Sequence, residues 1–480
     1  MTSERVLVVD VGTSSVRAAV VDTRARLVGE HREPLLPSSP TPGLVEFDPA
    51  VMAEVVLTVA RAALERHGPV AAVGVANQRG SAVLWDRASG VPVGPGIGWQ
   101  DLRTVGRCLE LQAEGIRVAP NHSATKLEWL LSQTERGRDL CFGTVDAWVA
   151  WTLSSGALHV TDASNAALTG LRTRDDDDWS EPTLAALQIP PAVLPTVVDS
   201  AGMVGEARAL PGAPPIGGLL GDQQASLLGQ GCVRPGDAKI TFGTGAMLDI
   251  VVGPDRPRFD RGPAGTFPIV TRRVDGADTW GLEAIMLAAG ANVEWLRDDL
   301  GLIPDAAASH DVASRCPDSG DVWFVPALLG IATPFWDYGA RGTLLGLTRG
   351  TTAAHVVRAV LEGIAHTAAD LVDATQRDAA TTIPALRIDG GMSANPTFVQ
   401  ALADAAQLPV EIAPVREATA LGAAFAAGLA VGIWPDDDAV AATWAPSERV
   451  LPAGRPDRER WRACVARARD WIPELSAIDL

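Results

Sequence analysis

Residues 10–17, Asp-Val-Gly-Thr-Ser-Ser-Val-Arg, combine a carboxylate, a glycine turn, three consecutive hydroxyls and an arginine. Backbone N–H groups and hydroxyls in such a turn could cradle phosphate oxygens. The Asp10 carboxylate could lie near a magnesium ion, and Arg17 could offset phosphate charge. An ordinary hairpin between two strands would have the same composition, so these residues alone leave both interpretations open.

The chain has two lysines, Lys126 and Lys239, and neither follows a glycine-rich loop. The G-x-x-x-x-G-K-[S/T] phosphate loop is therefore absent from the sequence. Any nucleotide site in this chain must be built in another way.

A second candidate is Asp222, which follows the apolar, glycine-containing stretch 216–221 and precedes a predicted helix. A carboxylate at this point could accept the proton of a substrate hydroxyl, the part that Asp plays in many phosphoryl transfers. Aspartate is also a favoured N-cap residue. The local sequence is compatible with either role.

A third candidate is residues 388–395, Ile-Asp-Gly-Gly-Met-Ser-Ala-Asn. Its two glycines would let the backbone approach a flat or bulky ligand closely. The residues that follow can begin a helix, whose N-terminus favours anions. A plain strand-to-helix turn is the alternative.

Short apolar runs that end in turn residues predict the strands, and apolar residues at helical spacing predict a helix over residues 49–67. The predicted strands cover residues 6–10, 16–22, 70–76 and 82–85. Segments 30–48 and 190–218 are rich in proline and glycine and are predicted to be loops. The run Asp175–Asp178 predicts a solvated turn rather than a metal site, because hard-cation loops space their ligands.

The strand–Gly-Thr–strand pattern of the N-terminus recurs at residues 239–252, where Lys-Ile-Thr-Phe-Gly-Thr-Gly leads into a second apolar run. The repeat suggests two related α/β domains facing each other, with a boundary near 230–238. We therefore expect a first domain over residues 1–232, a second over 233–434 and a helical tail over 435–480. The tail is acidic and then arginine-rich.

The formal net charge of −18 over 480 residues argues against nucleic acid and anionic membranes as partners, since both need a basic surface. The five cysteines form no C-x-x-C pair, and the N-terminus lacks a signal-peptide layout, which together favour a cytoplasmic protein. The apolar run 418–434 is slightly short for a membrane span and is predicted to be a buried helix.

Taken in order, these segments resemble the FGGY carbohydrate kinases, and among them the glycerol kinases. The resemblance covers nearly the whole chain and is carried by DVGTSSVRA, PGLVEFDP, ANQRG, TKLEWLL, FGTVDAWVAW, VTDASNA, GDQQASLLGQ, FGTGAM, PFWDYGARGTLLGLTRG, ALRIDGGMSAN and REATALGAAFAAGLAVG. The segment 342–362 fits a family signature throughout. The resemblance implies two actin-like, ribonuclease-H-like domains with a cleft between them, ATP and Mg²⁺ as cofactors, and domain closure that excludes water.

The resemblance also implies roles for individual residues. Asp222 is expected to be the catalytic base and Asp10 to lie near the metal. Contacts to the nucleotide are expected from Thr13, Ser14, Ser15, Arg17, Thr244, Gly290, Glu294, Gly391 and Asn395. At position 294 glycerol kinases carry Gln, so Glu294 departs from their pattern.

The residues implied to bind the acceptor substrate are Arg79, Gly80, Trp99, Asn121, Asp222, Gln223 and Met247. Three of them depart from the glycerol kinase pattern, because Gly80 replaces Glu, Asn121 replaces Tyr and Met247 replaces Phe. We expect the first two changes to enlarge the pocket, which predicts an acceptor longer than glycerol, such as a four- or five-carbon polyol or a ketose. Alternatively, water fills the space and glycerol still binds.

Two other classes of function remain open. The chain could be a non-catalytic nucleotide-binding protein on an actin-like fold, since fold does not fix function. It could also be a phosphohydrolase with water as the acceptor. A homodimer is typical of the family, and the sequence gives no recognisable loop for a sugar-bisphosphate regulator.

Overall fold

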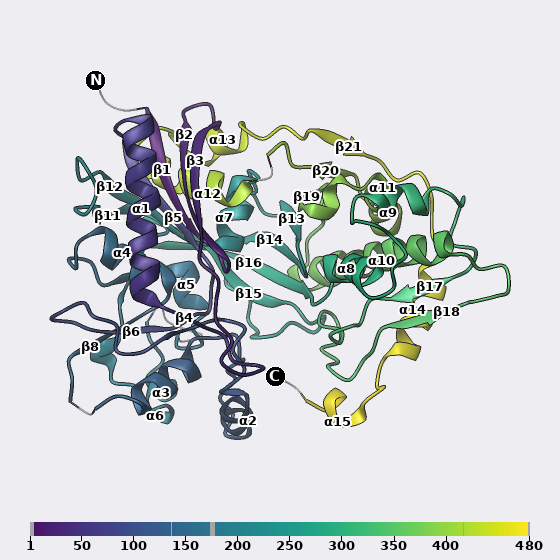
Figure 1. Cartoon of the computed structure of the whole chain (residues 1–480), viewed down its shortest axis with the longest axis horizontal. Coiled ribbons are helices and arrows are strands. Elements are labelled where there is room, and N and C mark those ends of the chain that lie inside the picture. Colours follow the sequence, from purple (N-terminus) through teal and green to yellow (C-terminus); the bar gives the residue numbers. More distant parts are fainter. Residues whose placement is uncertain (1–3, 136, 173–177, 416, 479–480) are drawn as a thin grey trace.

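The computed structural model describes residues 4–135, 137–172, 178–415 and 417–478. Most of the run Asp175–Asp178, which we predicted to be a solvated turn, lies outside these residues. Two mixed β-sheets form the framework of the molecule (Figure 1). We call the parts built on the two sheets the first and second lobes.

The first sheet has the strand order β11–β12–β5–β1–β2–β3. Its strands are β1 (Arg5–Val11), β2 (Ser15–Asp22), β3 (Leu27–Pro34), β5 (Ala72–Asn77), β11 (Ala201–Glu206) and β12 (Pro215–Gly221). Strands β1, β5 and β12 run parallel, whereas β2, β3 and β11 are antiparallel to their neighbours.

The second sheet has the order β15–β16–β14–β13–β19–β20–β21. Its strands are β13 (Ala238–Phe242), β14 (Ala246–Gly253), β15 (Phe267–Val274), β16 (Ala277–Met286), β19 (Leu386–Gly390), β20 (Val410–Ile412) and β21 (Glu448–Val450). Strands β13, β19 and β20 are parallel, and β14, β16 and β21 are antiparallel to their neighbours.

Six strands of the second sheet therefore repeat the order and directions of the first, and β15 is added at one edge. This match confirms that the sequence repeat reflects two related α/β units. It also means that the Gly-Thr turn between β13 and β14 is the counterpart of the turn between β1 and β2.

Helices cover the sheets and separate the lobes. In the first lobe these are α1 (Pro49–His67), α2 (Val105–Ala113), α3 (Ala124–Ser132), α4 (Val145–Leu153), α5 (Ala163–Ala167) and α6 (Glu181–Ala186), and α7 (Asp222–Gly229) leaves its edge. The second lobe has α8 (Gly290–Asp298), α9 (Ala308–Ala313), α10 (Ala353–Ala379), α11 (Pro396–Ala406), α14 (Arg458–Ala468) and α15 (Pro473–Ser476). Helix α13 (Asp437–Ala441) packs against the core of the first lobe (Figure 1). The residue range predicted for α1 agrees with the structure.

Shorter strands complete the two lobes outside the main sheets. Strand β4 (Glu46–Phe47) pairs with β7 (Gly96–Ile97), β6 (Val83–Asp86) with β8 (Leu140–Gly143), β9 (Val160–Asp162) with β10 (Thr196–Val198), and β17 (Trp323–Val325) with β18 (Thr343–Leu345). Single 3₁₀ turns lie at Pro191–Val193 and Gly391–Ala394.

Helix α12 (Ala418–Ala430) is almost wholly buried and packs on α7 and on strands β1, β5 and β12 of the first sheet. This confirms the buried helix predicted in the apolar run. Close packing against α7 depends on two glycines. A Cβ at Gly229 would overlap the carbonyl oxygen of Ala418, and one at Gly422 would overlap that of Ala225.

The two segments predicted to be loops contain strands, so those predictions were wrong. Segment 30–48 includes most of β3 and all of β4, and segment 190–218 includes β10, β11 and the start of β12. In β12, Gly217 and Gly218 face the backbone of α12, with 2.7 Å between the Cβ position of Gly218 and the nitrogen of Ala427. The glycines here allow a helix to approach a strand and do not make a turn.

Within the described part of the chain, no helix has the length and apolar composition needed to cross a membrane.

Candidate active site

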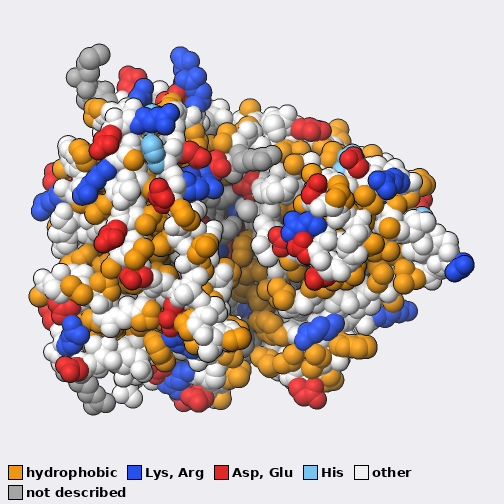
Figure 2. All heavy atoms as spheres, in the orientation of Figure 1, with side chains coloured by type: hydrophobic (Ala, Val, Ile, Leu, Met, Phe, Trp, Pro, Cys, Tyr) orange, Lys and Arg blue, Asp and Glu red, His pale blue; other side chains and the backbone are white. Residues whose placement is uncertain are grey.

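Several candidate residues of the first lobe lie at or just after the carboxyl ends of its three parallel strands. Val11 of β1 pairs with Asn77 of β5, and Asn77 pairs with Gly221 of β12. The turn after β1, Arg79 and Asp222 therefore lie at one edge of the sheet, where ligands of open α/β sheets bind. This edge faces the groove that Figure 2 shows between the two lobes.

The Asp222 carboxylate opens α7 but does not cap it. Gly221 is the N-cap residue without a side-chain cap, and Asp222 Oδ1 accepts the neighbouring N–H of Gln223, at 2.8 Å. The N-cap interpretation of this residue is therefore wrong. The side chain is 36% exposed, and its Oδ1 lies 3.2 Å from Arg79 Nε. Enclosure in the protein raises the pKa of Asp222, Arg79 opposes the shift, and Asp10 adds to it. This carboxylate can act as a base.

The turn at residues 12–14 is a hairpin between β1 and β2, closed by the Gly12 N–H donating to Ser15 O at 3.0 Å. The segment can be a hairpin and still bind phosphate, because the hairpin leaves hydroxyl groups accessible. Ser14 is exposed and Thr13 and Ser15 are partly exposed. Trp99 Nε1 donates to Thr13 Oγ1 at 3.4 Å, which connects the turn with a predicted acceptor residue.

Arg17 is 4% exposed, and its guanidinium pairs with carboxylates. Its Nη2 donates to Asp10 Oδ2 at 2.8 Å, and its Nη1 contacts Glu417 at the start of α12. The predicted phosphate contact from Arg17 would have to share or replace these partners.

In the second lobe, the Gly-Thr turn packs on the beginning of α8. The carbonyl oxygen of Thr244 accepts the N–H of Ala289 at 2.8 Å, and Gly290 N donates to Gly243 O at 3.0 Å. A Cβ at Gly290 would lie 2.6 Å from Gly243 O, so glycine is required for this contact. The structure thus brings the predicted residues Thr244 and Gly290 together. The Thr244 side chain is exposed.

The other predicted nucleotide residues lie on neighbouring elements. Glu294 is exposed on α8, and Gly391 is exposed directly after β19, the strand beside β13. Asn395 caps α11, where its Oδ1 accepts the Phe398 N–H at 3.1 Å and its Nδ2 donates to Ser309 Oγ at 2.9 Å. The amide of Asn395 therefore has a structural role in addition to the predicted one.

Arg79, a predicted acceptor residue, contacts the second lobe. Its Nη2 donates to Glu283 Oε2 at 2.7 Å and its Nη1 to Gln224 Oε1 at 3.4 Å, in addition to the contact with Asp222. Gln223 is held from the second lobe as well, because Lys239 Nζ donates to its Oε1 at 2.6 Å. Met247 contributes a partly exposed side chain from β14.

The position of Gly80 does not leave an open space. Its φ is +68°, and a Cβ there would overlap the carbonyl oxygen of Asn121, whose own side chain is exposed. Backbone of the neighbouring segment lies where a side chain at residue 80 would begin, and the expected enlargement of the pocket stays a prediction.

The ammonium of Lys126 joins the segments around this position. It donates to the carbonyl oxygens of Gly80 at 2.9 Å, His122 at 3.0 Å and Trp99 at 3.4 Å. The side chain is fully buried, and burial lowers the pKa of Lys126 to about 7. Three backbone segments that carry predicted acceptor residues thus meet at a single cation.

The contacts of Lys126, Lys239 and Glu283 with predicted acceptor residues were missed from the sequence. The signal that could have found the lysines is their rarity, since both lysines of the chain are fully buried next to predicted acceptor residues. No comparable signal marks Glu283.

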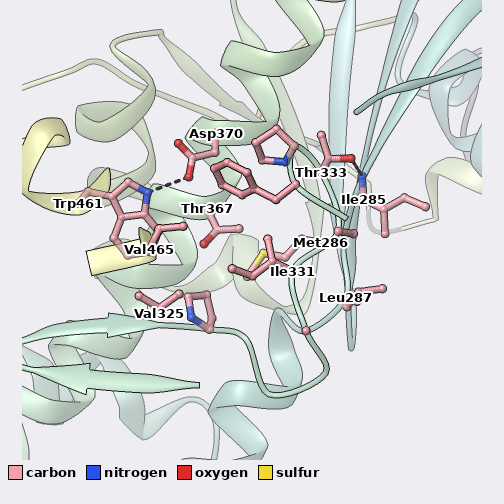
Figure 3. A pocket seen from close by; sticks show the side chains of 15 residues that line it. Ile285, Met286, Leu287, Val325, Ile331, Thr333, Thr367, Asp370, Trp461 and Val465 are labelled. Atoms are coloured by element: carbon pink, nitrogen blue, oxygen red, sulfur yellow. Dashed lines mark hydrogen bonds between the residues drawn. The ribbon is translucent and has the colours of Figure 1, made fainter. Parts of the chain in front are cut away.

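A separate cavity lies in the second lobe between the end of β16, α10 and α14 (Figure 3). Asp370 lines it and accepts from Trp461 Nε1 at 2.8 Å and from Arg458 Nη2 at 2.6 Å. None of the predicted site residues is among its lining residues. It carries no part of the site described above.

Comparison with known proteins agrees with this arrangement. Residues 5–229 match the N-terminal domain, and residues 238–431 the C-terminal domain, of the FGGY family of carbohydrate kinases. A protein named glycerol kinase from Aromatoleum aromaticum is 44% identical over 97% of this chain and 99% of its own length. One with the same name from Trichlorobacter lovleyi is 41% identical over 97% of this chain and 99% of its own length.

Among solved structures, Plasmodium falciparum glycerol kinase with ADP superposes with a TM-score of 0.90 and 27% identity, covering 99% of both chains. A protein named xyloylose kinase from Brucella ovis gives a TM-score of 0.87 and 25% identity over 99% of this chain and 100% of its own. Because the N-terminal and C-terminal domains of the family both match this chain, and in that order, the chain belongs to the FGGY family of carbohydrate kinases.

Proposed function

We propose that this protein transfers the γ-phosphoryl group of ATP to a hydroxyl of a small polyol, and that glycerol is the first acceptor to test. The observation that carries the proposal is the position of Asp222, beside Arg79 at the strand ends of the first lobe, with the next residue, Gln223, bonded to Lys239 of the second. The names of the relatives that are 38–44% identical support glycerol.

In this reaction Asp222 would accept the proton of the acceptor hydroxyl as its oxygen forms a bond to the γ-phosphorus. The bond between that phosphorus and the bridging oxygen to the β-phosphate breaks, and ADP leaves. The hydroxyls at 13–15 and the Thr244 turn would donate to phosphate oxygens as charge spreads over them. Arg79 and Gln223 would orient the acceptor, and Trp99 would pack against its carbon face.

Asp10 is the residue that would hold Mg²⁺. Within the described residues, no group of three His, Cys, Asp or Glu side chains is arranged to bind a metal. Mg²⁺ suits such a site, because it keeps several waters and is bound by one or two carboxylates together with substrate phosphates. Bound there, the metal would offset the negative charge of the phosphates.

A longer acceptor remains the second candidate. Its original support was an enlarged pocket, and the closed backbone at Gly80 removes part of that support. The exposed Asn121 side chain and Met247 in place of an aromatic residue still favour it. The likeness to the Brucella ovis structure is compatible with a sugar acceptor.

We propose the same domain division as from the sequence, 1–232, 233–434 and 435–480. The two matched family ranges and the change of sheet between β12 and β13 support the first boundary. Strand β21 of the tail pairs with β20, so the tail contributes to the second sheet. A cytoplasmic location and a homodimer stay predictions.

The test is a coupled assay of ADP release with glycerol, erythritol, the pentitols, xylulose and ribulose, in the presence of Mg²⁺ and ATP. Stimulation by glycerol with kcat/KM above about 10⁴ M⁻¹ s⁻¹ would support a glycerol kinase. A higher kcat/KM for a longer acceptor would favour the second candidate. ADP release that is equally fast without any acceptor would instead indicate a phosphohydrolase, and none at all would contradict the proposal.

A further inference from the structure

Three buried charged residues form a row across the second sheet. Lys239 of β13 pairs in register with Asp249 of β14, and Asp249 pairs with Glu283 of β16. Directly opposed residues on neighbouring strands point to the same face of a sheet. Lys239 Nζ lies 2.8 Å from Asp249 Oδ2, and the three residues are 0%, 0% and 4% exposed.

Both ends of this row contact the first lobe. At one end Lys239 donates to Gln223 at 2.6 Å, and at the other Glu283 accepts from Arg79 at 2.7 Å. Gln223 follows Asp222 in the chain, and Arg79 lies 3.2 Å from the Asp222 carboxylate. The row therefore contacts Gln223, which is next to the proposed base in the chain, and Arg79, which is next to it in space.

The electrostatics of the row make it dependent on the first lobe. Burial raises the pKa of Glu283, the Arg79 guanidinium opposes the shift, and the Asp249 carboxylate adds to it. A charged side chain is seldom fully buried without a partner, and removal of one partner from a buried pair is strongly destabilising. Since Arg79 comes from the first lobe, separating the lobes would leave Glu283 without its cation.

We infer that Glu283 and Lys239, bridged by Asp249, are positioning residues that fix Arg79 and Gln223 around the acceptor and the base. The inference rests on the proposed phosphoryl transfer. It assigns the second lobe a part in acceptor binding through strands β13, β14 and β16, distinct from the Gly-Thr turn that faces the nucleotide. The acceptor site is complete only while the row is docked on the first lobe.

The test compares Glu283→Gln and Lys239→Met with the wild type in the full chain. We expect the KM for the acceptor to rise and kcat to fall, each at least tenfold, while the dissociation constant for ADP, measured by calorimetry, stays within twofold. A purely structural role would lower the melting temperature without separating acceptor from nucleotide. Equal weakening of both ligands, or an unchanged acceptor KM, would overturn the inference.

A matched control is Asp370→Asn. Asp370 is also a carboxylate of the second lobe paired with an arginine, but it lines the cavity of Figure 3, whose lining includes none of the predicted site residues. We expect this variant to melt at lower temperature with unchanged acceptor KM. A change in acceptor KM as large as that of Glu283→Gln would show that any loss of a buried ion pair in this lobe suffices, and would also overturn the inference.

Double-mutant cycles test the two ends of the row separately. Glu283→Gln combined with Arg79→Met, and Lys239→Met combined with Gln223→Ala, should each be little worse than the more severe single variant, since each pair acts as a unit. Independent, multiplicative effects would contradict the assignment. If Glu283→Gln does not fold, Asp249→Asn tests the same row from its centre. Absence of wild-type turnover with every acceptor would instead overturn the proposed phosphoryl transfer itself.

Discussion

The backbone of Asn121 lies directly against Gly80, with its carbonyl oxygen in the place that a Cβ at residue 80 would take. Both residues depart from the glycerol kinase pattern, and the structure makes the departures interdependent. A side chain at position 80 would need both a new path for the segment around Asn121 and a left-handed backbone at φ +68°. Residues 80 and 121 therefore determine the shape of this part of the pocket together.

Gly80→Ala should destabilise the protein more than the same change at Gly301. Gly301 also has a positive φ, +61°, but no atom lies within 4 Å of its Cβ position. Gly301→Ala should cost about 1–2 kcal/mol for left-handed backbone alone. Gly80→Ala should cost about 1–3 kcal/mol more because of the overlap with Asn121. Urea unfolding of both variants measures the difference, and equal free energies of unfolding would contradict the close approach.

Asp222→Asn should lower kcat about 10²- to 10⁴-fold, because the amide cannot accept the hydroxyl proton. The pKa of Asp222 is raised by its enclosure, and the base acts as the carboxylate. The wild-type kcat/KM should therefore fall as the pH falls through this raised pKa, and the variant should lack this limb. ADP affinity, measured by calorimetry, should be unchanged. Near-normal activity of the variant would show that another group is the base.

The strand and turn residues of the site could be predicted from the sequence, because their order follows local rules. The hairpin at 10–17, its repeat at 239–252 and the helix over 49–67 each depend on residues close in the chain. The match between the two sheets extends this repeat to six strands, including β19, β20 and β21. Family resemblance then named the residues at the strand ends.

Contacts between distant residues could not be predicted in this way. Lys126 meets Gly80, which is 46 positions away, and Arg79 meets Glu283, which is 204 positions away. Such pairs depend on how the lobes dock, and a single sequence does not encode that in its local pattern. The glycines of β12 led to a different error. Their presence suggested a loop, whereas in the structure they let the strand pack closely against α12.

Asp10→Asn should raise the Mg²⁺ concentration that gives half-maximal activity at fixed ATP, by about tenfold. A neutral amide is a weaker ligand for a hard cation than a carboxylate. The control is Asp22→Asn, at the last residue of β2, where the carboxylate pairs with Arg26 at 2.7 Å. Its Mg²⁺ dependence should match that of the wild type. An unchanged dependence in Asp10→Asn would remove Asp10 from the metal site.

Acid should destabilise the protein through His366. Burial lowers the pKa of His366 to about 3, with Arg458 adding to the shift, whereas an unfolded histidine has a pKa of about 6.5. The unfolded state therefore binds the proton first as the pH falls below about 6.5, and stability decreases from there toward the folded pKa. Between pH 7 and 5 the loss should be about 2 kcal/mol. His366→Gln should lose correspondingly less over this range in urea unfolding, and an identical loss would contradict the prediction.

Lys126→Met should weaken acceptor binding without affecting the nucleotide. Methionine fills a similar volume but donates no hydrogen bond, so the buried carbonyl group of Gly80 and the partly buried ones of Trp99 and His122 lose a partner. Each buried polar group left unpaired costs about 1–3 kcal/mol. The carbonyl groups can regain a partner from water only if the segments move apart. Because all three segments carry predicted acceptor residues, we expect the acceptor KM to rise at least tenfold while ADP affinity stays within twofold.

Ser132→Ala, on an exposed position of the same helix α3, is the control and should leave both constants unchanged. The melting temperature of Lys126→Met should fall in either case, so it does not decide the question. The question is decided by comparing the change in acceptor KM with the change in ADP affinity, since ATP contacts are predicted in other segments. If Lys126→Met lowers stability but keeps the acceptor KM of the wild type, the ammonium only supports the fold, and the pocket is ordered by other contacts.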